Sequence, residues 1–242
     1  MLKSIKDIYK NAQFSSSLLG LFLNPFYITR VGLISNFKDL IPRLSGRLLD
    51  VGCGSKPYKD LCKVDEYIGL EIDDEGKRDH STADFFYDGS IMPFTDKYFD
   101  SIIANEVLEH VFNPSSFLRE LNRVSKKDGK IILTVPFVWD EHEQPYDYAR
   151  YSSFGLKYIL EKNGFEVIES RKSNKGLIVI FQLLTGYIFK MTVSKYSFLN
   201  ILISLLIIAP VNMLGIIISK ITPKNEDLYL NNIVLAKKIN DI

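Results

Sequence analysis

Short apolar runs alternate with segments of helical spacing over the first two thirds of the chain. Four such runs predict buried strands, which cover 47–52, 66–72, 98–104 and 129–135. A helix is predicted at 114–124, where four apolar residues share a face: Phe117, Leu118, Leu121 and Val124. A helix at 152–163 and strands at 165–170 and about 228–237 follow. Strands that alternate with helices predict an α/β fold, with a mostly parallel sheet and helices on both faces.

Residues 176–221 differ from the rest, because two long apolar stretches are separated there by only a short polar turn. The second stretch, 198–221, would form a helix of about 36 Å, long enough to cross a bilayer. The flanking strands must join one sheet, so the insertion must return to the side it left. We favour a helical hairpin that dips into one leaflet, because a two-pass span would put Lys190 and Lys195 on the far side, against the positive-inside tendency. A buried core or dimer interface is the third alternative.

Composition narrows the classes of function. Hydrophobic residues make up 46% of the chain, charged residues 24%, and the net charge is +1, so we expect no nucleic-acid partner. Cys53 and Cys62 have neither the spacing nor the neighbouring histidines of a metal site, and we expect no metal and no disulfide framework. The first residues lack a small-residue cleavage site, which predicts an uncleaved start with an amphipathic helix near Lys3 to Lys10.

The turn after the first strand carries the first candidate chemistry. The sequence there is Asp50-Val51-Gly52-Cys53-Gly54, and its glycines let the backbone adopt positive φ and pass close to a ligand. Ligands of open α/β sheets bind at the carboxyl ends of the strands. Glycines also serve ordinary tight turns. The full G-x-G-x-x-G fingerprint is absent, since Pro57 stands at its third glycine, and this argues against a nicotinamide dehydrogenase.

Two acidic positions extend the candidate nucleotide site. Glu71 lies at the end of the second strand, where a carboxylate can accept both hydroxyls of an adenosine ribose. Asp88 and Gly89 precede an apolar segment, so Asp88 can accept the exocyclic amine of an adenine whose ring that segment covers. Each position also has an ordinary interpretation: Glu71 as a solvated acid at a strand end, and Asp88-Gly89 as a turn.

Together these stretches resemble the large "type 11" group of class I S-adenosylmethionine-dependent methyltransferases. The matching segments, in the order and spacing of that family, are LLDVGCG, YIGLEID, YDGSIMPFTDKYFDSIIANEVLEHV, FLRELNRVSKKDGKIILTVP and GFEVIE. The resemblance implies a Rossmann-like sheet of seven strands, with the apolar helical insertion before the last one. It also implies S-adenosylmethionine as the methyl donor.

The resemblance also assigns cofactor contacts to individual residues. It implies that Asp50, Gly52 and Gly54, with Cys53 between the glycines, line the methionine and ribose side. Glu71 would hold the ribose, Asp88 with Gly89 the adenine, and Asn105 would lie beside the methionine moiety. The sequence departs from the family pattern at Glu71, where Asp is commoner, and at 55–58, which replaces a Gly-rich continuation.

A second pattern follows the fourth of these strands. Residues 142–151 contain H-x-x-P-x-D-x-x-R, which resembles a motif of methyltransferases encoded among bacterial cell-surface polysaccharide genes. A hydroxyl acceptor must lose a proton, so His142 is the candidate base, with Asp147 orienting it or the acceptor and Arg150 binding an anionic group. Alternatively, Asp147 and Arg150 pair only to brace the loop. His110 is the second candidate base, and a helix-capping or cofactor-wall role is equally open for it.

We therefore divide the chain into an N-terminal helical segment (1–46), a methyltransferase domain (47–175), an apolar hairpin (176–222) and a closing strand (223–242). The working hypothesis is a methyltransferase at the cytoplasmic face of the membrane, or in the cytoplasm, that acts on a hydroxyl of a small-molecule or lipid-linked glycan acceptor. One alternative is a methyltransferase for a soluble small molecule or a quinone-like lipid. Another is a catalytically dead, membrane-attached scaffold. The sequence leaves the oligomeric state open.

Overall fold

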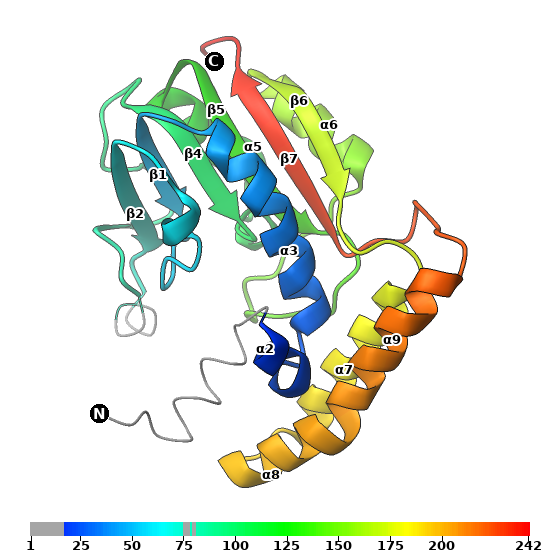
Figure 1. Ribbon diagram of the computed structural model, residues 1–242. Coiled ribbons are helices and arrows are strands. Elements are labelled where there is room, and N and C mark those ends of the chain that lie inside the picture. Colours follow the sequence, from blue (N-terminus) through cyan, green and yellow to red (C-terminus); the bar gives the residue numbers. More distant parts are fainter. Residues whose placement is uncertain (1–16, 75–77, 79–80) are drawn as a thin grey trace. The chain divides into compact units, whose positions relative to one another are not determined.

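The computed structural model describes residues 17–74, 78 and 81–242, and the helix expected near Lys3 to Lys10 lies outside them. In this described part the sheet has seven strands in the order β3-β2-β1-β4-β5-β7-β6 (Figure 1). The strands are β1 Arg47–Val51, β2 Glu66–Ile72, β3 Phe85–Tyr87, β4 Phe99–Asn105, β5 Ser125–Pro136, β6 Phe165–Lys172 and β7 Asn231–Lys238. Strands β1 to β5 pair in parallel, and β7 is antiparallel to β5. The predicted Rossmann-like α/β fold is confirmed.

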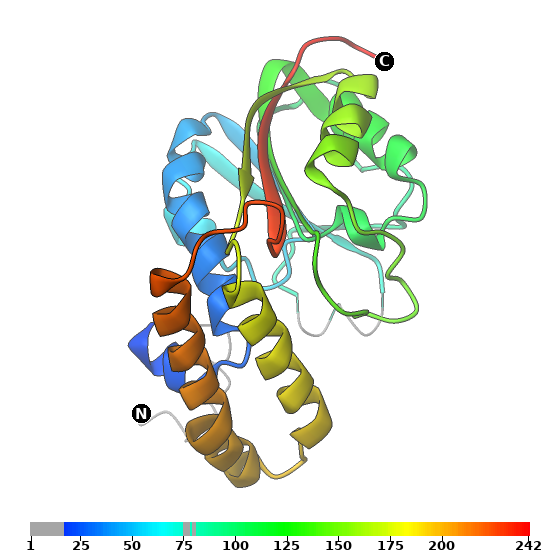
Figure 2. The same cartoon turned by 90° about the vertical axis from the view of Figure 1, so that its right-hand side faces the viewer.

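Helices cover the sheet and complete its core. Figure 2 shows α5 (Pro114–Val124) and α6 (Ser153–Lys162) on one side of the sheet. The side chain of Asn113 accepts from the Ser116 N–H to cap α5, and that of Ser152 accepts from the Gly155 N–H to cap α6. All four apolar residues predicted to share a face of α5 are buried. Short 3₁₀ helices lie at Ile41–Arg43, Lys59–Leu61 and Leu108–His110.

Among the described residues, 17–35, 138–140 and 172–230 form a compact unit of their own, and the others form the unit that holds the sheet. The helices described in the first of these units, which lacks the sheet, are α2 Leu18–Leu23, the first part of α3 (Tyr27–Leu40), α7 Ile178–Thr192, α8 Ser197–Ile203 and α9 Ala209–Ile221. One π-helical turn, Ser204–Ile208, joins α8 to α9 in a continuous helical run. This run lies beside α7 as a hairpin (Figures 1 and 2), which confirms an apolar helical insertion before the last strand.

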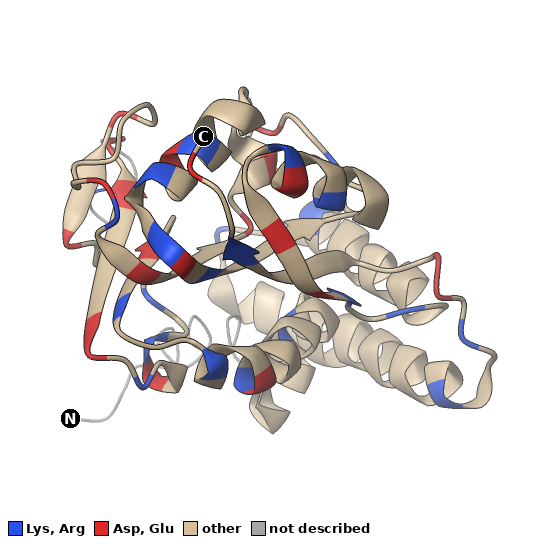
Figure 3. Ribbon diagram, turned by 90° about the horizontal axis from the view of Figure 1, so that it is seen from above, with Lys and Arg blue, Asp and Glu red and all other residues tan. Residues whose placement is uncertain are grey.

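The hairpin buries several polar side chains and exposes many large apolar ones. The buried side chains include Gln182, Thr185 and Asn212, while large apolar side chains lie exposed along both helices. Gln182 and Thr185 donate to the carbonyl oxygen of Pro25, at 2.9 Å each, and Asn212 donates to that of Asn24 at 3.3 Å. In Figure 3 these helices are tan over almost all of their length, so they carry few charges.

Candidate active site

The loop after β1 contains two glycines with different surroundings. Both have positive φ, +67° at Gly52 and +49° at Gly54. A Cβ at Gly52 would lie 2.5 Å from Cγ2 of Val107, so close packing of the protein itself requires glycine there. A Cβ at Gly54 would have no atom of the described residues within 4 Å. Gly54 therefore borders open space at the carboxyl end of the sheet.

Glu71 is tied to this loop. Its carboxylate accepts a hydrogen bond from the N–H of Gly54, at 2.9 Å, and the side chain is only 7% exposed. The carbonyl oxygen of Gly54 in turn accepts from the N–H of Thr82, at 2.9 Å. Glu71 is thus a buried, anchored carboxylate at the end of β2 and not a solvated strand-end acid.

Asp50 and Cys53, at the start and in the middle of this loop, are buried. Burial raises the pKa of Asp50 to about 7, although the hydroxyl of Tyr67, which donates to this carboxylate, acts in the opposite direction. Burial likewise raises the pKa of Cys53 to about 12, so its thiol stays protonated at neutral pH.

The remaining predicted cofactor residues lie at the ends of neighbouring strands. Asp88 follows β3, is exposed, and accepts from the N–H and the hydroxyl of Ser90 at 2.9 and 2.5 Å, so the predicted turn is present. Gly89 has a φ of +85°. Asn105 ends β4, and its Oδ1 accepts from Thr134 at 3.0 Å.

The loop and Glu71 fit the ribose and methionine part of S-adenosylmethionine. Open space at Gly54 lies beside a carboxylate whose position is fixed by a backbone hydrogen bond. Glu71 also accepts from the N–H of Ile72, at 3.1 Å. An ionised carboxylate has about four lone-pair sites, so these two backbone bonds leave capacity for ribose hydroxyls. The hydrogen bond from Gly54 to Glu71 joins the loop that contains Asp50 and Gly52 to the end of β2. Asp88 and Asn105 have no such bond to the loop among the described contacts, and we assign them to the same site because they lie at the ends of neighbouring strands.

The predicted acceptor residues are brought together around Asp147. Both Nη atoms of Arg150 donate to its carboxylate at 2.6 Å, and Nδ1 of His142 lies 3.1 Å from it. Burial is the largest single effect on the pKa of Asp147 and raises it, but the hydrogen bonds from Arg150 and the His142 N–H, together with the charge of Arg150, lower the pKa to about 2. The pairing of Asp147 with Arg150 expected under the bracing alternative is therefore present.

His110 faces His142 across this group. The two rings are 4.8 Å apart between centroids and meet edge to face. Nδ1 of His110 lies 2.8 Å from the carbonyl oxygen of Tyr146, and burial lowers the pKa of His110, which favours the neutral ring.

Glu109 was not among the residues predicted from the sequence, and its Oε1 lies 3.8 Å from Nε2 of His110 and 4.0 Å from Nε2 of His142. It is 0% exposed, and neither carboxylate oxygen has a hydrogen-bond partner among the described residues. Burial, with a further contribution from Glu106, raises the pKa of Glu109 well above its usual range. Its signal in the sequence was a single acid between Leu108 and His110, which sequence spacing alone does not distinguish from a surface acid.

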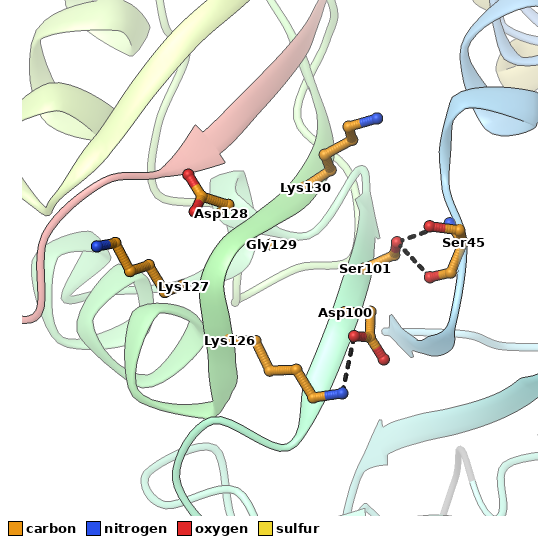
Figure 4. Close-up of a pocket in the computed structure, with 8 residues that line it drawn as sticks. All are labelled: Ser45, Asp100, Ser101, Lys126, Lys127, Asp128, Gly129 and Lys130. Carbon is orange, nitrogen blue, oxygen red and sulfur yellow. Dashed lines mark hydrogen bonds and ion pairs between the residues drawn. The ribbon is translucent and has the colours of Figure 1, made fainter.

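A small hollow of about 180 Å³ lies at the opposite ends of the strands (Figure 4). Some of its polar groups bond to one another: Ser101 bonds to Ser45, and Lys126 pairs with Asp100 at 2.7 Å. None of the predicted site residues lines this hollow, so the candidate chemistry stays at the carboxyl ends of the strands.

Comparison with known proteins identifies relatives of this chain. A family model described as a methyltransferase domain matches residues 29–170. An uncharacterised protein of Methanocaldococcus jannaschii is 30% identical over 115 residues, which cover 42% of this chain and 49% of that protein. The demethylmenaquinone methyltransferase of Renibacterium salmoninarum is 35% identical over 97 residues, covering 36% of this chain and 40% of that protein. The chain spans about half the length of the curated relatives it matches.

Solved structures match over a larger share of the chain. The crystal structure of a SAM-dependent methyltransferase from Archaeoglobus fulgidus has a TM-score of 0.55 at 20% identity, covering 92% of this chain and 100% of that chain. At this identity the likeness shows the fold alone, and it agrees with the sheet order described above.

Proposed function

Because the chain belongs to the methyltransferase-domain family, whose model matches residues 29–170, we propose that it is an S-adenosylmethionine-dependent methyltransferase. The observation that carries this proposal is the anchored carboxylate of Glu71 beside the open space at Gly54. When bound, S-adenosylmethionine supplies a methyl group that its sulfonium has already activated. Glu71 would hold the ribose hydroxyls, and the loop of Asp50 to Gly54 would receive the methionine side.

We further propose a hydroxyl acceptor at the group formed by His142, Asp147 and Arg150. The acceptor oxygen gains the methyl carbon, the S–CH3 bond breaks with its electron pair left on sulfur, and the hydroxyl proton passes to Nε2 of His142. Asp147 would hold the ring through Nδ1, at 3.1 Å. Because both Nη atoms of Arg150 are bonded to Asp147, Arg150 serves here as a positioning residue for that carboxylate.

A membrane-borne acceptor is proposed because of the apolar hairpin. Its exposed apolar side chains would be costly in water, at about 25 cal/mol per Å² of apolar surface. Its buried Gln182, Thr185 and Asn212 donate their hydrogen bonds inside the unit, the arrangement that a surface in contact with lipid requires. This distribution favours lipid contact over the core or dimer-interface alternative.

The lengths of the two helices favour a hairpin that dips into one leaflet over one that spans. The run Ser197–Ile221 has 25 residues and a mean hydropathy of 2.7 over its most apolar stretch, enough by length and composition to cross a membrane. α7 has only 15 residues, about 22 Å, which falls short of the hydrocarbon thickness of about 30 Å. Lys190, in the last turn of α7, pairs with Asp140 at 2.7 Å, and such an ion pair belongs in water or the headgroup region.

The proposed acceptor class is a lipid-linked glycan or another small molecule held at the cytoplasmic face of the membrane. The resemblance of residues 142–151 to methyltransferases of polysaccharide gene clusters supports the glycan. A quinone-like lipid is the second candidate, since one relative is a demethylmenaquinone methyltransferase. Both acceptor candidates are consistent with membrane contact through 176–221. The anchored carboxylate of Glu71 argues against the alternative of a catalytically dead scaffold.

The test is transfer of radiolabelled methyl from S-adenosylmethionine to lipid extracts. Full-length protein in lipid vesicles is incubated with the extract, and the labelled products are separated into glycan-bearing lipids and quinones. Label in the glycan-bearing fraction is the expected result. Label confined to quinones would select the second candidate, and failure to bind S-adenosylmethionine at all would establish the scaffold.

A further inference from the structure

We propose that Glu109, His110 and His142 form a binding site for one divalent transition-metal cation. Nε2 of His110 lies 3.8 Å from Oε1 of Glu109, and Nε2 of His142 lies 4.0 Å from the same oxygen. One ligand atom from each of the three residues can be chosen so that all lie within 4.8 Å of one another. This departs from the expectation of no metal, which rested on the cysteines alone.

These distances suit an ion better than direct hydrogen bonds. At 3.8 and 4.0 Å the imidazole nitrogens are beyond hydrogen-bonding reach of the carboxylate. A cation such as Zn²⁺ binds imidazole nitrogen and carboxylate oxygen at about 2.0–2.2 Å, so atoms on opposite sides of it lie roughly 3–4 Å apart. The three ligand atoms lie up to 4.8 Å from one another, so the side chains would have to move closer together around a bound ion.

Both rings are held by their other nitrogen in the manner of metal-binding histidines. Nδ1 of His110 lies 2.8 Å from the carbonyl oxygen of Tyr146, and Nδ1 of His142 lies 3.1 Å from Oδ2 of Asp147. A proton on each Nδ1 leaves a lone pair on each Nε2, aimed toward Glu109. A backbone carbonyl and a carboxylate are the usual outer partners of histidines that bind metals. Nη2 of Arg150 is also near Nδ1 of His142, at the longer distance of 3.4 Å.

The buried carboxylate of Glu109 supplies an independent reason. A carboxylate that is 0% exposed and has no hydrogen-bond partner among the described residues is costly for a fold to keep. A bound cation would compensate the negative charge and occupy the lone pairs that nothing else in the described chain meets. Two imidazoles with one carboxylate favour Zn²⁺ or a neighbour in its series over Mg²⁺, which prefers oxygen ligands.

This inference rests on the proposed function for what the cation would do. Three protein ligands leave a position open for an acceptor hydroxyl, whose pKa the cation would lower. With the cation bound, His142 is a ligand and the proton leaves to solvent instead of passing to its ring. Removal of the metal would then abolish methyl transfer, whereas a metal-free enzyme with His142 as base would be unaffected by a chelator.

The test measures Zn²⁺ binding without S-adenosylmethionine or acceptor. Full-length protein without a polyhistidine tag is freed of metal with a chelator and titrated by calorimetry. One ion per chain is expected. Asp147→Asn should weaken binding by about 10- to 100-fold, as loss of an outer partner does, and Glu109→Gln and His110→Gln by at least as much. Glu161→Gln, at an exposed position of α6, is the matched control for Glu109→Gln and should bind normally.

Two results would overturn the proposal: no binding by wild-type protein, or binding by Glu109→Gln that matches the control. A Co²⁺ spectrum of the wild-type protein gives a further test that needs no variant. Imidazole ligands are expected, and thiolate bands from Cys53 or Cys62 would contradict the assignment. Because this binding needs no methyl transfer, an ion bound by an inactive protein would refute the proposed function alone. Normal methyl transfer by metal-free protein would refute only the catalytic role given to the cation.

Discussion

The backbone N–H of Gly54 donates to the carboxylate of Glu71 across 2.9 Å, which joins the loop after β1 to the end of β2. The side chain proposed to hold the ribose therefore also fixes the loop that receives the rest of the cofactor. Substitutions at these two residues should act on one binding site, and those at Gly52 on folding, because its neighbour is Val107.

Gly54→Val should abolish or greatly weaken binding of S-adenosylmethionine, because the new side chain would fill the open space at that position. It should also lower the melting temperature somewhat, because a φ of +49° strains a β-branched residue. Gly52→Val should mainly lower the melting temperature, since its Cβ would lie 2.5 Å from a carbon of Val107. Calorimetric titration and thermal unfolding separate the two effects. Gly155→Ala, in the first turn of α6, is the control, and normal binding by Gly54→Val would refute the site.

Glu71→Ala should weaken S-adenosylmethionine binding by about 1.5–3 kcal/mol, the range for hydrogen bonds to a charged group. Glu71→Gln keeps an oxygen that can accept from Gly54 but loses the charge, so its loss should be smaller. Calorimetry on both variants, with no competition by NAD, checks the assignment. Equal losses would mean that the carboxylate charge contributes nothing.

Asp50 should make stability depend on pH between about 4 and 7. Its folded-state pKa, about 7, lies above the ordinary value of 3.8, so the folded state holds the proton more tightly. The resulting stabilisation is complete below about pH 4 and is lost as the pH rises through 7. Urea unfolding of Asp50→Asn should show a flatter dependence across this range.

Tyr67→Phe removes the hydroxyl that donates to Asp50 and should raise the pKa of Asp50 further. Carbon NMR of the labelled carboxyl measures the change directly. A pKa that stays the same or falls in Tyr67→Phe would contradict this prediction.

Most strands and the hairpin could be predicted from sequence because each contains a run of apolar residues bounded by turn or polar residues. β3 could not, since Phe85–Tyr87 has only three residues, too few to show a pattern. Glu109 escaped prediction for another reason: its burial depends on the loop of residues 142–151, which packs against it from a distant part of the chain. Likewise, the sequence allowed both roles for Arg150, and only three-dimensional geometry revealed its two bonds to Asp147.

His142→Ala should lower turnover about 10²- to 10⁴-fold while leaving S-adenosylmethionine affinity nearly unchanged. The reason holds whether the ring accepts the proton or binds the proposed cation, because both act on the acceptor. Initial rates at saturating cofactor measure the effect, and Glu161→Ala, at an exposed position of α6, is the control. Loss of turnover in His110→Ala with normal turnover in His142→Ala would reverse the assignment.

Leu206 and Ile217 are exposed apolar residues of the hairpin, and changing both to Lys should release the protein from lipid vesicles. Phe154→Lys, at an exposed apolar position of α6, is the matched control and should leave vesicle binding unchanged. Vesicle flotation at low and high salt is the measurement, since hydrophobic burial is not screened by salt. Wild-type protein that stays monodisperse without lipid or detergent would refute the membrane proposal.

A cysteine in place of Ser197, the first residue of α8, tests whether the hairpin spans the membrane. If it dips into one leaflet, an impermeant thiol reagent added to the outside of intact cells should not label this position. If it crosses, the reagent should label it. Cys53 and Cys62 are first changed to Ser, so that the new thiol alone is measured.

The position of β7 sets an order of events during synthesis. β7 is the last strand in the chain, yet it lies between β5 and β6 in the sheet. The sheet therefore cannot close until residues 231–238 have left the ribosome, by which time the whole hairpin has already emerged. A nascent chain thus presents its apolar helices to chaperones or lipid while the domain is still open at β5. Truncation before residue 231 would leave the position between β5 and β6 empty, even though the whole cofactor loop would still be present.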